Sequence, residues 1–447
     1  MTAFARPQFS SRLGFILAAT GSAVGLGNIW SFPTQAAGNG GAAFVLVYCA
    51  LAFALAYPAL MAELVIGRHQ RANIVSALGG LSQQTTIRRI GVGVGLYGVL
   101  IASLILAFYS IVGGWIMAHA LQPGAQIIGA NKPAHWLTQQ SPWRDISFSG
   151  IFVVLTIAIV AAGVGRGIER WSTRLMPTLL ILMVVLIAYV WSLEGASDGL
   201  RLLLVPDLSR LANPSLLISA MGQAFFSLSL GVGTMLIYGS YINPEDNLPV
   251  TGAIVAAVDM AIALLAGLLI IPAIFVAQHL GINIYDDAGT LQSGPGLIFD
   301  TLPALFETMG TIGWLISMSF FTLLTIAALT SSISMLEVPV SYLEERHQLN
   351  RHRATIIAGL SIFAISTIIA LNFDSLFGAV VDFTTKYSQP VLGVLLCIFA
   401  GWIMHRDSLL KTLGTKEHPI FNRIWPIYVR FFCPLLISAI FIHSLLT

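Results

Sequence analysis

Apolar runs of about 20 residues recur along nearly the whole of this 447-residue chain. A run of that length can cross the hydrocarbon core of a bilayer as an α-helix. The composition agrees, because 56% of the residues are hydrophobic and only 9% are charged, whereas ordinary soluble domains carry about 25% charged residues. So few charged residues cannot cover a water-exposed surface of normal size. The chain is therefore predicted to be an all-α polytopic membrane protein.

The lengths and positions of the apolar runs predict about eleven membrane-spanning helices. They are expected near residues 12–37, 41–67, 90–120, 148–165, 173–193, 215–241, 250–280, 311–343, 353–372, 376–404 and 425–446. Arginine and lysine concentrate in alternate connections, and by the positive-inside rule those connections are cytoplasmic. The N-terminus is then predicted to lie in the cytoplasm and, with an odd number of spans, the C-terminus outside. The polar N-terminal segment leads straight into a full-length span, so no cleavable signal peptide is expected.

Two spans contain residues that break helices. The first holds GSAVGLGNIWSFP, from Gly21 to Pro33, and the sixth holds GQAFFSLSLGVGTM, from Gly222 to Met235. Glycines can also serve close helix packing, which suits the glycines of the third span. Packing needs neither the adjacent Asn28 nor a second break five spans later. The matched breaks instead predict two five-span repeats of opposite topology, with a binding site near the middle of the membrane.

These repeats divide the chain into four parts. They are a cytoplasmic N-terminus (1–11), the first repeat (12–193), the second repeat (194–404), and a cytoplasmic loop with the eleventh span (405–447). Unwound backbone at membrane depth is tolerated where it lines a cavity, and its free carbonyls can hold a cation. The N-terminal end of a half-helix can hold a carboxylate. Of the long outer connections, 281–310 has a composition that would allow it to fold back as a lid, although a plain surface loop is commoner.

Other classes of function fit the sequence poorly. The net charge of +2 does not suggest a nucleic-acid partner. No span carries the polar stripe of a channel pore beyond the two breaks, and neither a zinc-protease motif nor a phosphate loop is present. Three cysteines in apolar runs are expected to be buried thiols: Cys49, Cys397 and Cys433. A transporter with broken helices is the favoured class, with sodium or protons as the coupling ion.

The two broken segments also carry a resemblance. GSAVGLGNIWSFP followed by NGGAAFVLVY resembles the first-span signature of the neurotransmitter:sodium symporter family, GQAFFSLSLGVG its sixth span and LTSSIS its eighth. The similarity extends through nearly the whole chain. It implies a LeuT-like fold and sodium-coupled import of an amino acid across the inner membrane of a bacterium. It implies no cofactor besides the sodium ions, no nucleic acid and no obligate protein partner, with lipid as the surroundings.

The resemblance implies two sodium sites. The first would use the Ala23 carbonyl, Asn28, Ser227, Asp259 and the carboxylate of the substrate. The second would use the carbonyls of Gly21, Val24 and Ala327 with the hydroxyls of Thr330 and Ser331. Oxygen ligands of this kind suit a hard cation.

The resemblance also implies a substrate site. The amides of Leu26 and Gly27 and the hydroxyl of Tyr109 would hold the substrate carboxylate, beside Ser227. The side-chain pocket would be lined by Ser22, Ala23, Ile105, Phe226, Ser229, Val232, Ser331 and Met335. Monoamine carriers place an acidic residue at the position of Gly25, so a substrate with its own carboxylate is expected. A neutral hydrophobic amino acid is favoured, and glycine, alanine or a betaine is the rival.

Several ionisable residues lie within or near the predicted spans. The resemblance suggests that Glu63 braces the broken helices, and Glu337 is expected to be structural or part of an inner gate. Asp259 lies mid-span, where a carboxylate needs a partner such as a bound cation. Asp382 and Lys386 are one helical turn apart, which favours an ion pair. Three histidines are expected near span ends: His119, His279 and His443.

Two positions depart from the family pattern. Asp259 replaces the usual asparagine, so it is expected to supply the negative charge that chloride provides in animal members through residues matching Tyr48, Gln223 and Ser227. Ser31 replaces an arginine that would face Asp382 in the outer gate. Without that arginine, closure is expected to depend mainly on Tyr109 and Phe226, with Lys386 neutralising Asp382.

Overall fold

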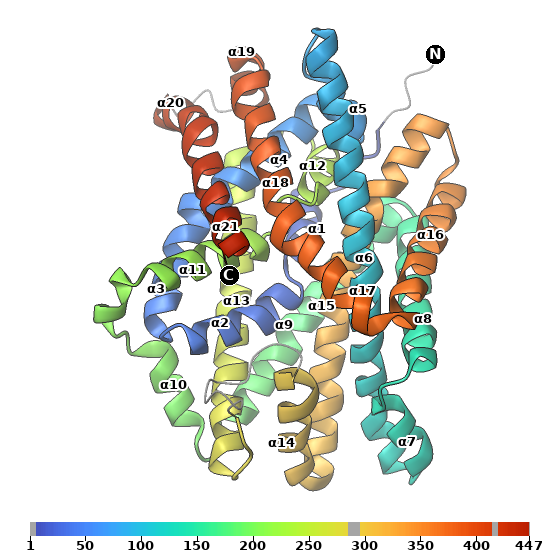
Figure 1. Ribbon diagram of the computed structural model, residues 1–447, viewed down its shortest axis with the longest axis vertical. Helices are drawn as coiled ribbons and strands as arrows, with labels where there is room; N and C mark the ends of the chain where they lie inside the picture. Colours follow the sequence, from blue (N-terminus) through green and yellow to red (C-terminus); the bar gives the residue numbers. More distant parts are fainter. Residues whose placement is uncertain (1–5, 285–295, 414–418, 447) are drawn as a thin grey trace.

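The computed structural model describes residues 6–284, 296–413 and 419–446, and this part of the chain is a bundle of helices (Figure 1). The α-helices are α1 (Arg12–Ala23), α2 (Phe32–Gly38), α3 (Ala42–Leu51), α4 (Tyr57–Gln70), α5 (Ile74–Gly80), α6 (Thr85–Ile127), α7 (Asn131–Thr138), α8 (Pro142–Ala161), α9 (Arg170–Trp191), α10 (Ala196–Leu204), α11 (Pro214–Ser227), α12 (Thr234–Gly239), α13 (Leu248–His279), α14 (Leu302–Thr308), α15 (Gly310–His347), α16 (Arg351–Leu371), α17 (Phe373–Val381), α18 (Gln389–Ile398), α19 (Arg406–Leu413), α20 (Pro419–Ile427) and α21 (Cys433–Leu446).

Shorter π and 3₁₀ segments join or extend several of these helices. They are η1 (Gly27–Ser31), η2 (Ala52–Ala56), η3 (Val164–Glu169), η4 (Leu208–Ala212), η5 (Leu297–Thr301), η6 (Asp382–Ser388), η7 (Phe399–Ile403) and η8 (Tyr428–Phe432). Within the described residues, nine continuous helices are long and apolar enough to cross a membrane, and α1 with residues 27–38 forms a tenth, bent span. The half-helices α11 and α12 supply the remaining span of the predicted set. The fold class expected from the sequence is thus confirmed.

One predicted boundary is wrong. The fifth helix was expected from residue 173, but the structure begins it at Val164, so Arg166 and Arg170 lie within it rather than in a connection. Gly163, with φ of +93°, turns the chain directly after α8. A glycine adopts this backbone conformation without the steric cost that a side chain would add. The turn is therefore tight, and the next helix starts at once.

Both predicted breaks are present. The first span ends its inner half at Ala23, bends by 58° and resumes at Gly27. In the sixth span, α11 ends at Ser227 and α12 begins at Thr234, and three residues between them have positive φ: Ser229, Gly231 and Gly233. A side chain at Gly231 would place its Cβ 2.2 Å from the Gln389 carbonyl oxygen. Only glycine fits so close an approach of two backbones.

Helices α4 and α12 pack backbone against backbone. A Cβ added at Gly67 of α4 would lie 1.9 Å from the carbonyl oxygen of Leu236 in α12. A Cβ added at Gly239 of α12 would lie 2.7 Å from the carbonyl oxygen of Leu64 in α4. Because each helix has a glycine at the contact, no side chain separates the two backbones there. The second span and the inner half of the sixth span can therefore pack closely.

The connections separate to opposite ends of the bundle. Helices α19 and α20 lie at one end, together with the N-terminal segment, and α7 and α14 lie at the other (Figure 1). This grouping agrees with the predicted alternation of connections, since α19 and α20 belong to an arginine- and lysine-rich connection whereas α7 and α14 belong to connections poor in both. The two breaks lie between these ends, deep in the bundle.

Candidate functional site

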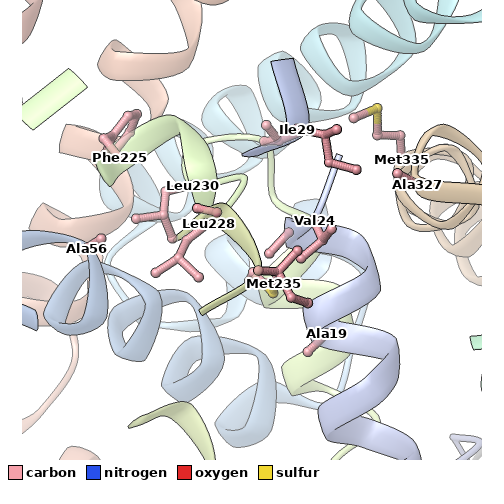
Figure 2. Close-up of a cluster of buried hydrophobic side chains, with 14 of the residues drawn as sticks. Ala19, Val24, Ile29, Ala56, Phe225, Leu228, Leu230, Met235, Ala327 and Met335 are labelled. Atoms are coloured by element: carbon pink, nitrogen blue, oxygen red, sulfur yellow. The ribbon is translucent and has the colours of Figure 1, made fainter. Parts of the chain in front are cut away.

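The two breaks meet in the core of the bundle. Apolar side chains from the first break and the sixth break pack together there with residues of α15, among them Val24, Ile29, Leu228, Leu230 and Ala327 (Figure 2). These side chains are buried, so the polar groups beside them are shielded from water. Electrostatic attraction is stronger in such surroundings than at a surface.

Three residues expected at the first sodium site form one hydrogen-bonded cluster. The Nδ2 atom of Asn28 donates to Asp259 Oδ1 at 2.8 Å and to Ser227 Oγ at 2.9 Å. Ser227 Oγ lies 2.6 Å from Asp259 Oδ2, and the Tyr48 hydroxyl lies 3.1 Å from Ser227 Oγ. The cluster joins η1, α11 and α13, and so ties both repeats together.

The cluster has an excess of negative charge and a spare acceptor atom. Asp259 is 2% exposed, and none of the basic side chains in the described chain forms an ion pair with it. The Oδ1 atom of Asn28 is buried and has no hydrogen-bond partner among the described residues. A buried carboxylate without a cation is costly, and the free oxygen beside it is a suitable ligand for sodium. These residues fit the cation that the sequence predicts.

The residues expected at the second sodium site also converge. Ser331 Oγ lies 3.4 Å from the Gly21 carbonyl oxygen and 3.2 Å from that of Val24. Thr330 Oγ1 lies 3.0 Å from the Ala327 carbonyl oxygen, one turn earlier in α15. The break in the first span frees the Val24 carbonyl from the helix, and α15 supplies the hydroxyls. All five predicted oxygens thus come from two adjoining segments.

The expected position of the substrate carboxylate lies next to the first break. The Tyr109 hydroxyl is buried and has no hydrogen-bond partner among the described residues. A Cβ added at Gly27 would meet no atom within 4 Å, whereas one at Gly25 would lie 2.7 Å from Ser331 Oγ and 3.0 Å from Tyr109 Oη. There is space beside Gly27 and almost none beside Gly25. An acidic side chain at Gly25, as in monoamine carriers, would not fit without movement.

The expected side-chain pocket is mainly apolar. Ala23, Ile105, Val232 and Met335 are buried, and Phe226 is partly exposed. The serines are engaged elsewhere: the Ser22 hydroxyl donates to Ser334 Oγ at 2.7 Å and the Ser229 hydroxyl to the Ser22 carbonyl oxygen at 3.1 Å. These bonds connect the first span to the sixth and eighth.

Glu63 contacts the broken sixth span. Its Oε1 accepts a 2.8 Å hydrogen bond from the Gly231 amide, and the carboxylate is 2% exposed. Gln389 supports the same turn by donating to the Leu230 carbonyl at 2.7 Å. Unwound backbone loses its helical partners, and these side chains replace some of them. Glu63 therefore braces the sixth span, as expected. Among the described residues, it has no hydrogen bond to the first span.

Sequence reasoning found Glu337 but missed its partners. Glu337 is fully buried, and its carboxylate accepts from Arg351 at 2.5 and 2.9 Å and from the Tyr241 hydroxyl at 2.6 Å. Arg6 of the N-terminal segment pairs with Glu345 and donates to Ser240 Oγ at 2.8 Å. This inner network joins the N-terminus, the end of the sixth span, α15 and α16. In the sequence, Arg6 contributed only to the predicted orientation of the N-terminus. Its ion pair could not be predicted, because Glu345 is more than 300 residues away in the chain.

The outer side lacks the usual arginine, as the sequence indicates. Asp382 pairs with Lys386 at 3.1 Å, which confirms the predicted contact one turn apart, and both side chains are about half exposed. Ser31 contacts Gln223 instead, with 2.8 Å between Oγ and Oε1. The gating pair of the family is therefore replaced by two separate contacts.

The outer connection suggested as a lid is described in part, since residues 285–295 lie outside the described ranges. Phe299 of η5 packs on Trp30 of the first span and on Trp115 and His119 of α6, with ring centroids 4.9–6.0 Å apart. A cavity of about 930 Å³ lies beside it, lined by α6, α8, α14, α15 and α17. This arrangement agrees with a segment that folds back over the outer face.

The three histidines occupy different surroundings. His119 is buried and its Nδ1 lies 2.8 Å from the Trp115 carbonyl oxygen. His279 lies at the end of α13, 3.4 Å from Glu194, and His443 lies in the last turn of α21. Cys397 and Cys433 are buried as expected, and Cys49 is partly exposed.

Comparison with known proteins agrees with this fold. The model of the sodium:neurotransmitter symporter family matches residues 6–133 and 146–447. An uncharacterized sodium-dependent transporter of Bacillus subtilis, YhdH, is 33% identical over 98% of this chain and 97% of its own length. The bovine sodium- and chloride-dependent taurine transporter is 26% identical over 98% of this chain and 78% of its own.

A solved structure is also similar. The crystal structure of MhsT in complex with L-phenylalanine superposes with a TM-score of 0.83, at 34% identity, and the match covers 98% of this chain and 100% of that one. The fold, the family match and the similarity to sodium-dependent transporters place the chain in this class of membrane transporter. The chain belongs to the sodium:neurotransmitter symporter family.

Proposed function

We propose that the protein imports a neutral hydrophobic amino acid, coupled to two sodium ions, by alternating access of its two repeats. The observation that carries this proposal is the unpartnered Tyr109 hydroxyl at the first break, which would lie 3.0 Å from a Cβ at Gly25, together with the open space beside Gly27. A carboxylate placed there would receive charge-assisted hydrogen bonds and would face the first sodium ion. Substrate and ion would then each raise the affinity of the other by the same factor.

The pocket favours an uncharged side chain. None of the residues expected to line it is charged, so an acidic or basic ligand would be buried without a partner. Met335 is flexible and can adapt to ligands of different shape. The similarity to MhsT, whose crystal structure contains L-phenylalanine, supports a hydrophobic ligand. Discrimination between close analogues is expected to be weak, because one methylene is worth about 1–3 kcal/mol in an apolar pocket.

Chloride has no role in this proposal. Ser227 bonds to Asp259, and Gln223 is turned toward Ser31 and Gly27, so two of the residues that match chloride ligands are engaged with protein groups. The Asp259 carboxylate would supply the negative charge from within the sodium site. When sodium leaves, the same carboxylate could take up a proton, since it would lose its cationic partner.

The proposed location is the inner membrane of a bacterium, with the N-terminus and the inner network on the cytoplasmic side and the C-terminus outside. The concentration of arginine at the end of the bundle that holds α19 and α20 supports this orientation. The two repeats, 12–193 and 194–404, would be the units that alternate.

A thermal-shift screen tests the substrate. In sodium, leucine, valine, tyrosine or tryptophan is expected to raise the melting temperature, and the shift should vanish when potassium replaces sodium. If only glycine, alanine or betaine raises the melting temperature, the substrate is a small compound and not a hydrophobic amino acid. An equal response in potassium, with uptake driven by a pH gradient in proteoliposomes, would establish a proton-coupled carrier instead.

A second test concerns the outer gate. Phe226→Ala is expected to reduce uptake at least tenfold, because the ring would no longer cover the bound substrate. Asp382→Asn should retain more than half of wild-type uptake, since its exposed pair with Lys386 contributes only about 0–1 kcal/mol. Initial rates in proteoliposomes at matched protein content measure both. Equal losses in the two variants would show that Asp382 takes part in closure despite the absence of the arginine.

A further inference from the structure

Gln223 forms hydrogen bonds with both ends of its amide, and both partners lie in the first span. Its Nε2 donates to the Gly27 carbonyl oxygen at 2.9 Å, and its Oε1 lies 2.8 Å from Ser31 Oγ. A carbonyl oxygen can only accept, so the amide nitrogen must face Gly27 and the amide oxygen must face Ser31. The Ser31 hydroxyl is then the donor. The Gly27 carbonyl thus sets the orientation of the amide, and the Ser31 hydroxyl supplies the donor for the amide oxygen.

The Gly27 carbonyl belongs to the peptide that joins Gly27 to Asn28. Of the two residues that this peptide joins, Gly27 has open space beside it, where the substrate carboxylate is proposed to bind, and Asn28 contributes its side chain to the first sodium cluster. The break leaves η1 to start at Gly27, directly after the bend. A displacement of this peptide would therefore move a substrate contact and a sodium ligand together.

Gln223 is 4% exposed, so its amide depends on these partners for its hydrogen bonds. A buried polar group left without a partner is costly. Loss of the Ser31 hydroxyl would leave Oε1 with no described donor, and the amide could then rotate or withdraw from Gly27. The short serine side chain provides this contact at the position where the family pattern has arginine.

We propose that Ser31 and Gln223 are positioning residues for sodium–substrate coupling. Ser31 donates to the Gln223 amide oxygen and so keeps the amide in place, and the amide holds the Gly27–Asn28 peptide at the junction of the two sites. The same contacts tie the outer half of the first span to the outer half of the sixth, α11. The effect on substrate binding rests on the proposed function. The effect on the first sodium site does not depend on the identity of the substrate.

The first measurement needs no substrate. Hydrogen–deuterium exchange of peptides covering residues 24–33 is followed in sodium and in potassium. Sodium is expected to slow exchange in the wild type. Ser31→Ala should exchange faster than the wild type in sodium, by about two- to tenfold, as expected for loss of one hydrogen bond. Ser31→Thr keeps the hydroxyl and should restore the slow exchange.

Thr34→Val is the matched control. It also removes a hydroxyl, one turn further along, but that hydroxyl bonds to the carbonyls of Ser31 and Trp30 within its own helix. It is expected to behave like the wild type. If Ser31→Ala and Thr34→Val exchange alike, or if Ser31→Thr fails to restore protection, the positioning role is wrong.

The second measurement concerns coupling. The sodium concentration for half-maximal binding of the amino acid found in the thermal-shift screen is expected to rise about two- to tenfold in Ser31→Ala. Adding Ser31→Ala to Gln223→Leu should cause no further rise, because the two residues act through one contact. Additive effects would overturn the proposal. Altered sodium protection together with no binding of any neutral amino acid would instead refute the proposed substrate and leave the positioning role intact.

Discussion

Replacing Asp259 with alanine is expected to abolish sodium-driven uptake, because Asp259 is the carboxylate that the protein itself contributes to the first sodium cluster. Removing one partner of a buried charge pair costs about 3–5 kcal/mol, which corresponds to a loss of at least about 100-fold in sodium affinity. Uptake in proteoliposomes and the sodium dependence of thermal stability measure the change. Asp207→Asn, an exposed carboxylate in the loop before α11, is the control and should leave both unchanged.

Asp259→Asn separates the charge from the shape of the site. The amide keeps one acceptor and similar size, but it carries no charge. Wild-type uptake is expected to be the same in chloride and in gluconate. The Asn variant should fail in gluconate and recover in part in chloride, since a bound anion could supply the missing charge. Wild-type uptake that falls sharply in gluconate would contradict the role given to Asp259.

Among the variants proposed here, Glu337→Ala is expected to cause the largest loss of stability. Arg351 would lose its main carboxylate and Tyr241 its acceptor, in a network where Glu337 is fully buried. The cost should again be about 3–5 kcal/mol, because the largely buried Arg351 would keep only its partly exposed pair with Glu344. The melting temperature in detergent and the uptake rate measure the effect.

Glu344→Ala is a well-matched comparison. Glu344 pairs with the same arginine at 2.9 Å but is 27% exposed, so its loss should cost about 1 kcal/mol or less. A loss in Glu344→Ala as large as that in Glu337→Ala would show that burial does not set the strength of these pairs. A melting temperature of Glu337→Ala equal to that of the wild type would also show that burial does not set the strength of these pairs.

Much of this fold could be predicted from the sequence, because its strongest constraint is local. Each span is a continuous apolar run, and the two breaks are marked by glycines close together in the chain. The boundary at Val164 was missed since the turn at Gly163 is too tight to leave a polar connection. Ion pairs between residues far apart in the chain, such as Arg6 with Glu345, leave no periodic pattern in the sequence. They could be identified only in the structure.

The site shows the same limit. Motif resemblance predicted Asn28, Ser227 and Asp259, which the structure brings within hydrogen-bond distance of one another. It also indicated that Ser31 cannot form the usual outer pair. It did not predict that Ser31 would bond to Gln223, because that contact depends on how an amide rotates within a buried interface.

The glycine contact between α4 and α12 has a mechanical consequence. The two backbones are in direct contact at Gly67 and Gly239, and close-packed contacts of this kind resist rearrangement. The Glu63–Gly231 bond adds a contact between α4 and the unwound turn that precedes α12. We therefore expect the second span and the inner half of the sixth to move as one rigid unit during transport.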